Sequence, residues 1–295
     1  FYGEGEASSK SINSLTYQYY PGKIEILAII DGAQQNKDTY NSVLSTIQKV
    51  KDEANRDIKV IPKWKRGGKV SSLNSGLEKA SHDIVMSLDG ETSFDNDMVY
   101  QVTRHFNNKN VVAVSGNLRI RNGWESVTTA MQSIEYMIAI TLGKTGLNEF
   151  RVVNNISGAF GVFRKKVIKH IGGWENGAAE DLDITMRMKN YFRRHPEMKI
   201  VFDPKATGHT DGPVGFWELI KQRERWDGDL SYIYLKKFKN SLSPKIIGWR
   251  EFIFYVGYGL FFQIIMPFFI IFYNFYYFFA GSLADVLTMN FFIFL

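Results

Sequence analysis

The feature that most constrains this chain is a long apolar segment, residues 252–280, which contains no Asp, Glu, Lys or Arg. It exceeds the roughly 20 residues that a helix needs to cross a bilayer. Its tyrosines suit a membrane–water boundary, and Pro267 is expected to kink or interrupt the helix. The alternative is a buried helix of a soluble protein, which this length disfavours. The sequence therefore predicts a transmembrane helix.

The residues around this segment predict its orientation. Five basic residues crowd the approach to it: Lys236, Lys237, Lys239, Lys245 and Arg250. By the positive-inside rule, that side of the membrane is cytoplasmic. The last residues, FFIFL, suggest a second span that is cut short. We therefore expect a multi-pass protein of the cell membrane whose polar part is cytoplasmic.

The N-terminal end and the overall composition add further limits. The polar N-terminus shows no signal peptide, and Phe1 and Tyr2 are expected to be the end of a strand whose start is missing. The net charge of +6 is mild and its Lys and Arg residues are dispersed, which argues against a nucleic-acid partner. The absence of cysteine excludes disulfides, Cys-based zinc sites and a cysteine nucleophile.

Before the apolar segment, predicted strands alternate with predicted helices. Apolar runs predict strands at 24–30, 58–61, 84–88, 111–115 and 199–202. Apolar spacing and capping patterns predict helices at 8–18, 39–54, 69–80, 124–142, 179–192 and 215–226. This alternation is typical of an α/β fold with a parallel sheet. Ligands of such sheets bind at the carboxyl ends of the strands.

Carboxylates follow two of the predicted strands. Asp31 follows strand 24–30, and Asp89-Gly90-Glu91 follows strand 84–88. Asp89 and Glu91 can point into one cleft, where hard divalent cations and the phosphates they bridge need oxygen ligands. A solvated acidic turn is the alternative for this motif taken alone.

Acidic residues also open the predicted helix 179–192. Glu180, Asp181 and Asp183 would favour the helix dipole, and they could be no more than helix-capping residues. Neighbouring carboxylates raise the pKa of a carboxyl group towards neutrality, which would help such a group to act as a general base. His209 could be a metal ligand, although a structural histidine is favoured.

In their order and spacing these motifs resemble those of the family 2 glycosyltransferases, in particular the processive membrane branch. That branch includes synthases of poly-N-acetylglucosamine, chitin, hyaluronan and cellulose. The likeness covers residues 1 to about 250. It implies a GT-A (Rossmann-like) domain at 1–213, interfacial amphipathic helices at 214–250 and transmembrane segments at 251–295.

The resemblance also implies roles for individual residues. Asp181, in Ala-Glu-Asp, matches the catalytic base. The positions that match donor- and nucleotide-binding residues are Asp31, Lys69, Asp89, Gln222 and Arg225. The positions that match acceptor-binding residues are Ser157, which replaces a proline, Gly158 and Trp226. Asp89 and Glu91 match the ligands of a Mg²⁺ or Mn²⁺ ion, with Glu91 in place of the family's second aspartate.

The motif Gln-Arg-Glu-Arg-Trp, residues 222–226, contains two arginines that could contact a diphosphate. Arg223 and Arg225 lie two apart on a helix and point in different directions, so only one should reach a diphosphate. We expect Arg225 to do so and Arg223 to form a structural ion pair. Trp226 offers an apolar face on which a sugar ring can stack, or an anchor at the membrane interface.

The resemblance implies a membrane-bound inverting enzyme that polymerises a β-linked polysaccharide from a UDP-sugar. Its partners would be the donor, the growing polysaccharide and the lipid bilayer. Residues 116–122, GNLRIRN, favour UDP-N-acetylglucosamine as donor, with UDP-glucose second. Two alternatives stay open: a non-processive transferase that adds one sugar to a lipid, and an inactive nucleotide-binding membrane scaffold.

Overall fold

The computed structural model describes residues 1–50, 55–175, 177 and 179–294. Its strands are β1 (Ile24–Asp31), β2 (Arg56–Lys63), β3 (Ile84–Leu88), β4 (Ser93–Phe94), β5 (Val111–Ile120), β6 (Phe160–Arg164) and β7 (Lys199–Thr210). The helices before the apolar segment are α1 (Ala7–Thr16), α2 (Lys37–Val50), α3 (Gly68–Lys79), α4 (Met98–Thr103), α5 (Val127–Tyr136), α6 (Lys144–Glu149), α7 (Lys165–His170), α8 (Glu180–Lys189) and α9 (Phe216–Tyr232). The end of the predicted helix 39–54 lies outside the described residues.

The strands form two sheets, and the larger one is mixed. Strands β1 and β2 pair in parallel, while the second sheet has the order β3-β6-β5-β7-β4. Within it only β5 and β7 run parallel, because β6 and β4 pair antiparallel with their neighbours. The expectation of one parallel sheet is therefore wrong. The reason is β6, which follows the α5–α6 excursion and inserts between β3 and β5.

The mixed sheet is covered on both faces. Strand β5 is buried along its first eight residues. One apolar cluster joins the sheet to α7 and α8 through Phe163, Ile168 and Ile184. A second cluster joins it to α4 through Met98 and Val162. Burial of this apolar surface holds α8 against the sheet. The first turn of α8 contains the predicted base, Asp181.

The smaller sheet packs with α1 and α2 and contacts the N-terminal residue. The amino group of Phe1 donates to Ile29 O at 2.8 Å, and Asp31 N donates to Phe1 O at 2.9 Å. These two bonds have the pattern of a parallel ladder between Phe1 and β1. A cavity of about 990 Å³ separates β1 from β3 and receives side chains from both.

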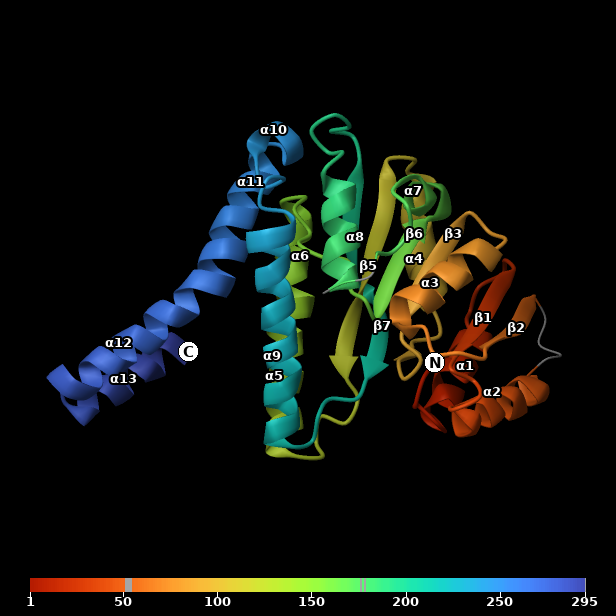
Figure 1. Cartoon of the computed structure of the whole chain (residues 1–295), viewed down its shortest axis with the longest axis horizontal. Helices are drawn as coiled ribbons and strands as arrows, with labels where there is room; N and C mark the ends of the chain where they lie inside the picture. Colours follow the sequence, from red (N-terminus) through yellow and green to blue (C-terminus); the bar gives the residue numbers. More distant parts are fainter. Residues whose placement is uncertain (51–54, 176, 178, 295) are drawn as a thin grey trace.

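The C-terminal part leaves the body of the molecule as one long helical segment (Figure 1). It comprises α11 (Trp249–Phe254), the π-helical segment Tyr255–Ile265 and α12 (Met266–Ala280), and it follows the short helix α10 (Pro244–Ile247). It is 32 residues long and contains an 18-residue stretch with a mean hydropathy of 1.9, so its length and composition suffice to cross a membrane. Helix α13 (Leu283–Phe294) turns back beside α12, and no second helix in the described residues is long and apolar enough for a span.

A buried ion pair connects the start of this long helix to α8. Lys189 Nζ lies 2.7 Å from Glu251 Oε2, and the two side chains are 0% and 3% exposed. The Lys189 ammonium also lies 4.8 Å from the centre of the Tyr255 ring, whose hydroxyl donates to Asn154 O. The apolar helix is thus attached to the helix that carries Asp181.

Removing one partner of this pair should destabilise the protein. We expect Glu251→Leu to cost about 3–5 kcal/mol, because it leaves the Lys189 charge buried without compensation. The double variant Lys189→Met/Glu251→Leu should recover most of this loss. Thermal unfolding of detergent-solubilised protein measures both effects.

The control is Asp57→Asn, which removes the exposed ion pair with Lys59 and should leave the melting temperature almost unchanged. A Glu251→Leu protein as stable as the unchanged chain would contradict a structural role for the buried pair.

Candidate active site

Asp31, at the end of β1, organises the loop that precedes α3. Its carboxylate accepts hydrogen bonds from Lys63 Nζ at 2.8 Å, from Gly67 N at 2.9 Å and from Gly68 N at 2.8 Å. Burial alone would raise the pKa of Asp31, but these three donors outweigh it and hold the pKa below its usual value. Asp31 is therefore an ionised anchor for the loop that carries Lys69.

Lys69, in the first turn of α3, joins two acidic residues that are far apart in the sequence. Its Nζ lies 2.8 Å from Asp89 Oδ1 and 2.9 Å from Glu180 Oε1. Burial would lower the pKa of Lys69, but the two carboxylates raise it above its usual value. A permanently charged ammonium thus connects the end of β3 with the first residue of α8.

Glu91 lies in a region with more negative than positive charge. Burial and the charges of Asp89, Glu4 and Asp211 raise the pKa of Glu91, and only Arg121 opposes them. Glu4 Oε2 is buried and has no hydrogen-bond partner in the described residues. Lys69 pairs with Asp89, but the carboxylates in this region outnumber the basic groups, and the remaining negative charge fits a divalent cation held by Asp89 and Glu91. The described residues contain no ready-made cluster of three or more metal ligands, so the remaining ligands would be oxygens of substrate or water.

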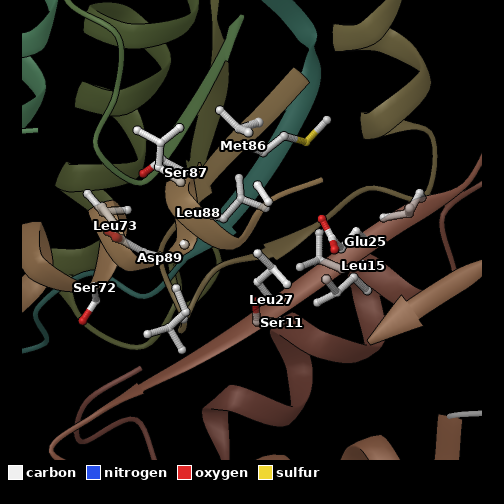
Figure 2. Close-up of a pocket in the computed structure, with 18 of the residues that line it drawn as sticks. Ser11, Leu15, Glu25, Leu27, Ser72, Leu73, Met86, Ser87, Leu88 and Asp89 are labelled. Carbon is white, nitrogen blue, oxygen red and sulfur yellow. The ribbon is translucent and has the colours of Figure 1, made fainter. Parts of the chain in front are cut away.

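These residues lie along the cavity between β1 and β3. Asp31, Lys69, Asp89 and Glu91 all line it. Figure 2 shows Asp89 at the end of β3, near Ser72 and Leu73 of α3, with Leu27 of β1 lining the same cavity. The two predicted acidic strand ends thus face one cavity, although β1 and β3 belong to different sheets.

Asp181 is the second residue of α8 and is tied to the segment before β6. Its Oδ2 accepts from Gly158 N and from Asn155 Nδ2, both at 3.3 Å, and its Oδ1 accepts from Leu182 N at 2.7 Å. Burial and the charge of Glu180 raise the pKa of Asp181, against the opposing effect of two lysines. A carboxylate with a raised pKa is suited to accept a proton near neutral pH.

The residues Ser157 and Gly158 form the close contact between these groups. Ser157 N donates to Ser115 Oγ at 3.2 Å. A methyl group at Gly158 would lie 3.0 Å from Glu180 Oε1 and 3.3 Å from Lys69 Nζ, so a side chain there would push on both. The absence of a side chain lets the backbone approach Asp181 and Lys69 together.

The motif Gln-Arg-Glu-Arg-Trp lies on α9, which packs beside α5 and away from β1 and β2 (Figure 1). Arg223 pairs with Glu135 at 2.7 Å and lies over the Trp226 ring at 4.7 Å, so it forms the structural ion pair that was expected of it. Arg225 is exposed. None of Gln222, Arg225 and Trp226 lines the cavity.

Other predictions have simpler outcomes. His209 Nε2 lies 2.9 Å from Asp95 Oδ1, across the pairing of β4 with β7, which fits the favoured structural histidine. Sequence reasoning overlooked Glu4, Asn155 and Lys144. For Lys144 there was a signal, because it is the only charge between Tyr136 and Asn148. For Glu4 and Asn155 the sequence holds no distinguishing pattern.

Comparison with known proteins identifies the family. Residues 3–228 match the family described as "Glycosyltransferase like family 2". A poly-beta-1,6-N-acetyl-D-glucosamine synthase of Staphylococcus epidermidis is 30% identical over 246 residues, which are 83% of this chain and 56% of that protein. The synthase of Staphylococcus aureus strain COL is 31% identical over 245 residues, with the same coverage. The chain thus spans about half the length of the curated relatives it matches.

Solved structures show the same fold at low identity. The mannosyltransferase PcManGT from Pyrobaculum calidifontis, in complex with GDP-Man and Mn²⁺, superposes with a TM-score of 0.68 at 15% identity, covering 98% of this chain and 77% of that one. S. aureus TarS gives a TM-score of 0.53 at 14% identity, covering 81% of this chain and 38% of that one. The family match covers most of the chain, and the mixed sheet agrees with these folds. The chain therefore belongs to glycosyltransferase family 2 and has the GT-A fold.

Proposed function

We propose that this chain is the catalytic part of a membrane-bound, inverting glycosyltransferase. It polymerises N-acetylglucosamine from UDP-N-acetylglucosamine into a β-linked polysaccharide, and UDP-glucose is the second candidate donor. The proposal rests on one observation above all, the Lys69 bridge between Asp89 and Glu180, which places the end of β3 beside the base candidate Asp181. The printed names of the staphylococcal relatives support the choice of sugar.

On the donor side, Asp31 and Lys69 bind the nucleotide of the UDP-sugar at the cavity, with Asp31 at the base or ribose, as its position in the family motif implies. Asp31 keeps the loop of Gly67 and Gly68 in place, and the Lys69 ammonium offers positive charge to the phosphates. When bound at Asp89 and Glu91, a Mg²⁺ or Mn²⁺ ion supplies further positive charge for the diphosphate leaving group. Gln222 and Arg225 of α9 match donor-binding residues of the family and complete the donor site. For them to reach the donor, its diphosphate must extend towards α9.

On the acceptor side, Asp181 removes the proton from the attacking hydroxyl. Gly158 N and Asn155 Nδ2 fix the orientation of its Oδ2. Ser157, Gly158 and Trp226 bind the acceptor sugar. Attack on the donor's anomeric carbon from the side opposite the diphosphate inverts an α-linked donor into a β-linkage in a single displacement.

The segment Trp249–Ala280 spans the bilayer in this proposal, with the basic residues before it on the cytoplasmic side. The exposed apolar side chains of α5 and α9, among them Met131, Ile134 and Trp217, then face the membrane surface. The catalytic domain is cytoplasmic, where nucleotide sugars are supplied.

The first test is UDP release by the purified, detergent-solubilised protein. Each UDP-sugar is supplied in turn with Mg²⁺ or Mn²⁺. We expect release with UDP-N-acetylglucosamine and a loss of about 10²–10⁴-fold in Asp181→Asn, because proton removal is lost. Asp57→Asn, a change in an exposed carboxylate, is the matched control.

Nucleotide binding without release from any donor would favour the inactive scaffold. Release that stops after one sugar per acceptor, seen as product length on a gel, would favour the non-processive transferase.

The second test uses the charge next to the base. Activity should fall as pH drops through the pKa of Asp181, because only the carboxylate can accept a proton. Glu180 raises that pKa, so Glu180→Gln should move the acidic limb of the kcat/KM profile to lower pH. A limb that stays in place or moves to higher pH would contradict Asp181 as the base.

The third test removes the cation. We expect chelation to abolish UDP release and added Mn²⁺ or Mg²⁺ to restore it. Asp89→Asn should need at least ten times more metal for half-maximal activity, because one of its two protein carboxylates is lost. Asp95→Asn is the control. Asp95 follows β4, pairs with His209 and does not line the cavity, so this variant should keep the metal response of the unchanged chain. Full activity in the chelator would contradict the proposed metal site.

A further inference from the structure

Lys144 is a buried lysine without an acidic partner at ion-pair distance. It is the first residue of α6, is 6% exposed, and forms no ion pair within the described part of the chain. Its Nζ donates to Asn155 O at 3.2 Å and to Ser115 Oγ at 3.5 Å. Enclosing an ammonium with so few partners costs free energy, so the position needs a reason other than packing.

Both partners of Lys144, Asn155 and Ser115 of β5, are linked by hydrogen bonds to the segment that holds Asp181. Asn155 accepts from Lys144 with its carbonyl and donates with its side chain to Asp181 Oδ2 at 3.3 Å. Ser115 Oγ also accepts from Ser157 N at 3.2 Å, and the next residue, Gly158, donates its N–H to Asp181 Oδ2. Asp181 Oδ2 thus has two donors, Asn155 Nδ2 and Gly158 N. Lys144 is linked to the first through the Asn155 carbonyl and to the second through Ser115 and Ser157.

The charges of Lys144 and Asp181 also affect each other. Burial lowers the pKa of Lys144 to about 8, and the charge of Asp181 opposes this shift. Lys144 in turn affects Asp181: burial and the charge of Glu180 raise the pKa of Asp181, and the charge of Lys144 lowers it. The charged groups facing Asp181 are thus Glu180 from α8, Lys69 from α3 and Lys144 from α6. Tyr234 lies near it as a phenol that burial keeps neutral.

We propose that Lys144 is a positioning residue for Asp181: its buried ammonium orients the carboxylate through Asn155 and Ser115 and keeps it ionised. The inference rests on the proposed function, because it assumes that Asp181 is the base. Lys69 is tied to Asp89 and Glu180 on the donor side, so Lys144 supplies the positive charge that is dedicated to the base.

The test is the pH profile of UDP release by Lys144→Met, which keeps the length of the side chain and removes its charge. We expect the acidic limb of kcat to move up by about one pH unit, which is about a tenfold loss of rate on that limb. The KM for the donor should change less than twofold. A role in packing alone would instead lower the rate equally at every pH.

A second variant separates charge from structure. In Lys144→Met/Glu180→Gln the two opposite effects on Asp181 should largely cancel, so the acidic limb should return close to its position in the unchanged chain. If Lys144→Met does not unfold cooperatively, Lys144→Gln, which keeps a hydrogen-bond donor, gives the same test.

An acidic limb that stays in place in a folded, active Lys144→Met or Lys144→Gln protein would overturn the role of Lys144 and leave the proposed function intact. Absence of UDP release by the unchanged chain would overturn both.

Discussion

The site depends on the ion bridge that Lys69 forms between Asp89 and Glu180. These two carboxylates come from the end of β3 and the start of α8, elements separated by about 90 residues of sequence, and the ammonium lies within 3 Å of both. Without that charge, the carboxylates would repel each other in a half-buried region. Asp31 supports the bridge from the other end, because it fixes the loop from which Lys69 emerges.

Charge is distributed unevenly across the site, and the distribution matches two chemical tasks. Around Asp89 and Glu91 negative charge is in excess, and Glu4 adds a buried oxygen without a partner among the described residues. Such a region attracts a cation and the phosphates that the cation binds. Around Asp181, two lysines partly offset Glu180 and burial, so the carboxylate is a stronger base than usual and is still able to ionise. The proposed transfer uses the first region for the leaving group and the second for the acceptor.

Much of the fold could be predicted from the sequence, because local patterns determine helices and strands. The elements around Asp31, Lys69 and Asp89 lie within a few residues of the predicted ones. The mixed sheet could not be predicted, since antiparallel pairing of β6 with β3 and β5 is a long-range property and its glycine-containing sequence resembles a loop. Lys144 is the lone charge in its stretch of sequence, but its burial could not be predicted, for another reason. The π-helical segment Met137–Gly143 shifts the helical register just before it, so helical periodicity does not reveal which face is buried. The α9 motif does not line the cavity, which spacing in the sequence could not reveal.

The most direct test of the account is the anomeric configuration of the product, determined by NMR after transfer from UDP-N-acetylglucosamine labelled at the anomeric carbon. A single displacement with Asp181 as base predicts a new linkage that is entirely β. An α-linkage, or release of free N-acetylglucosamine in place of a glycoside, would contradict it.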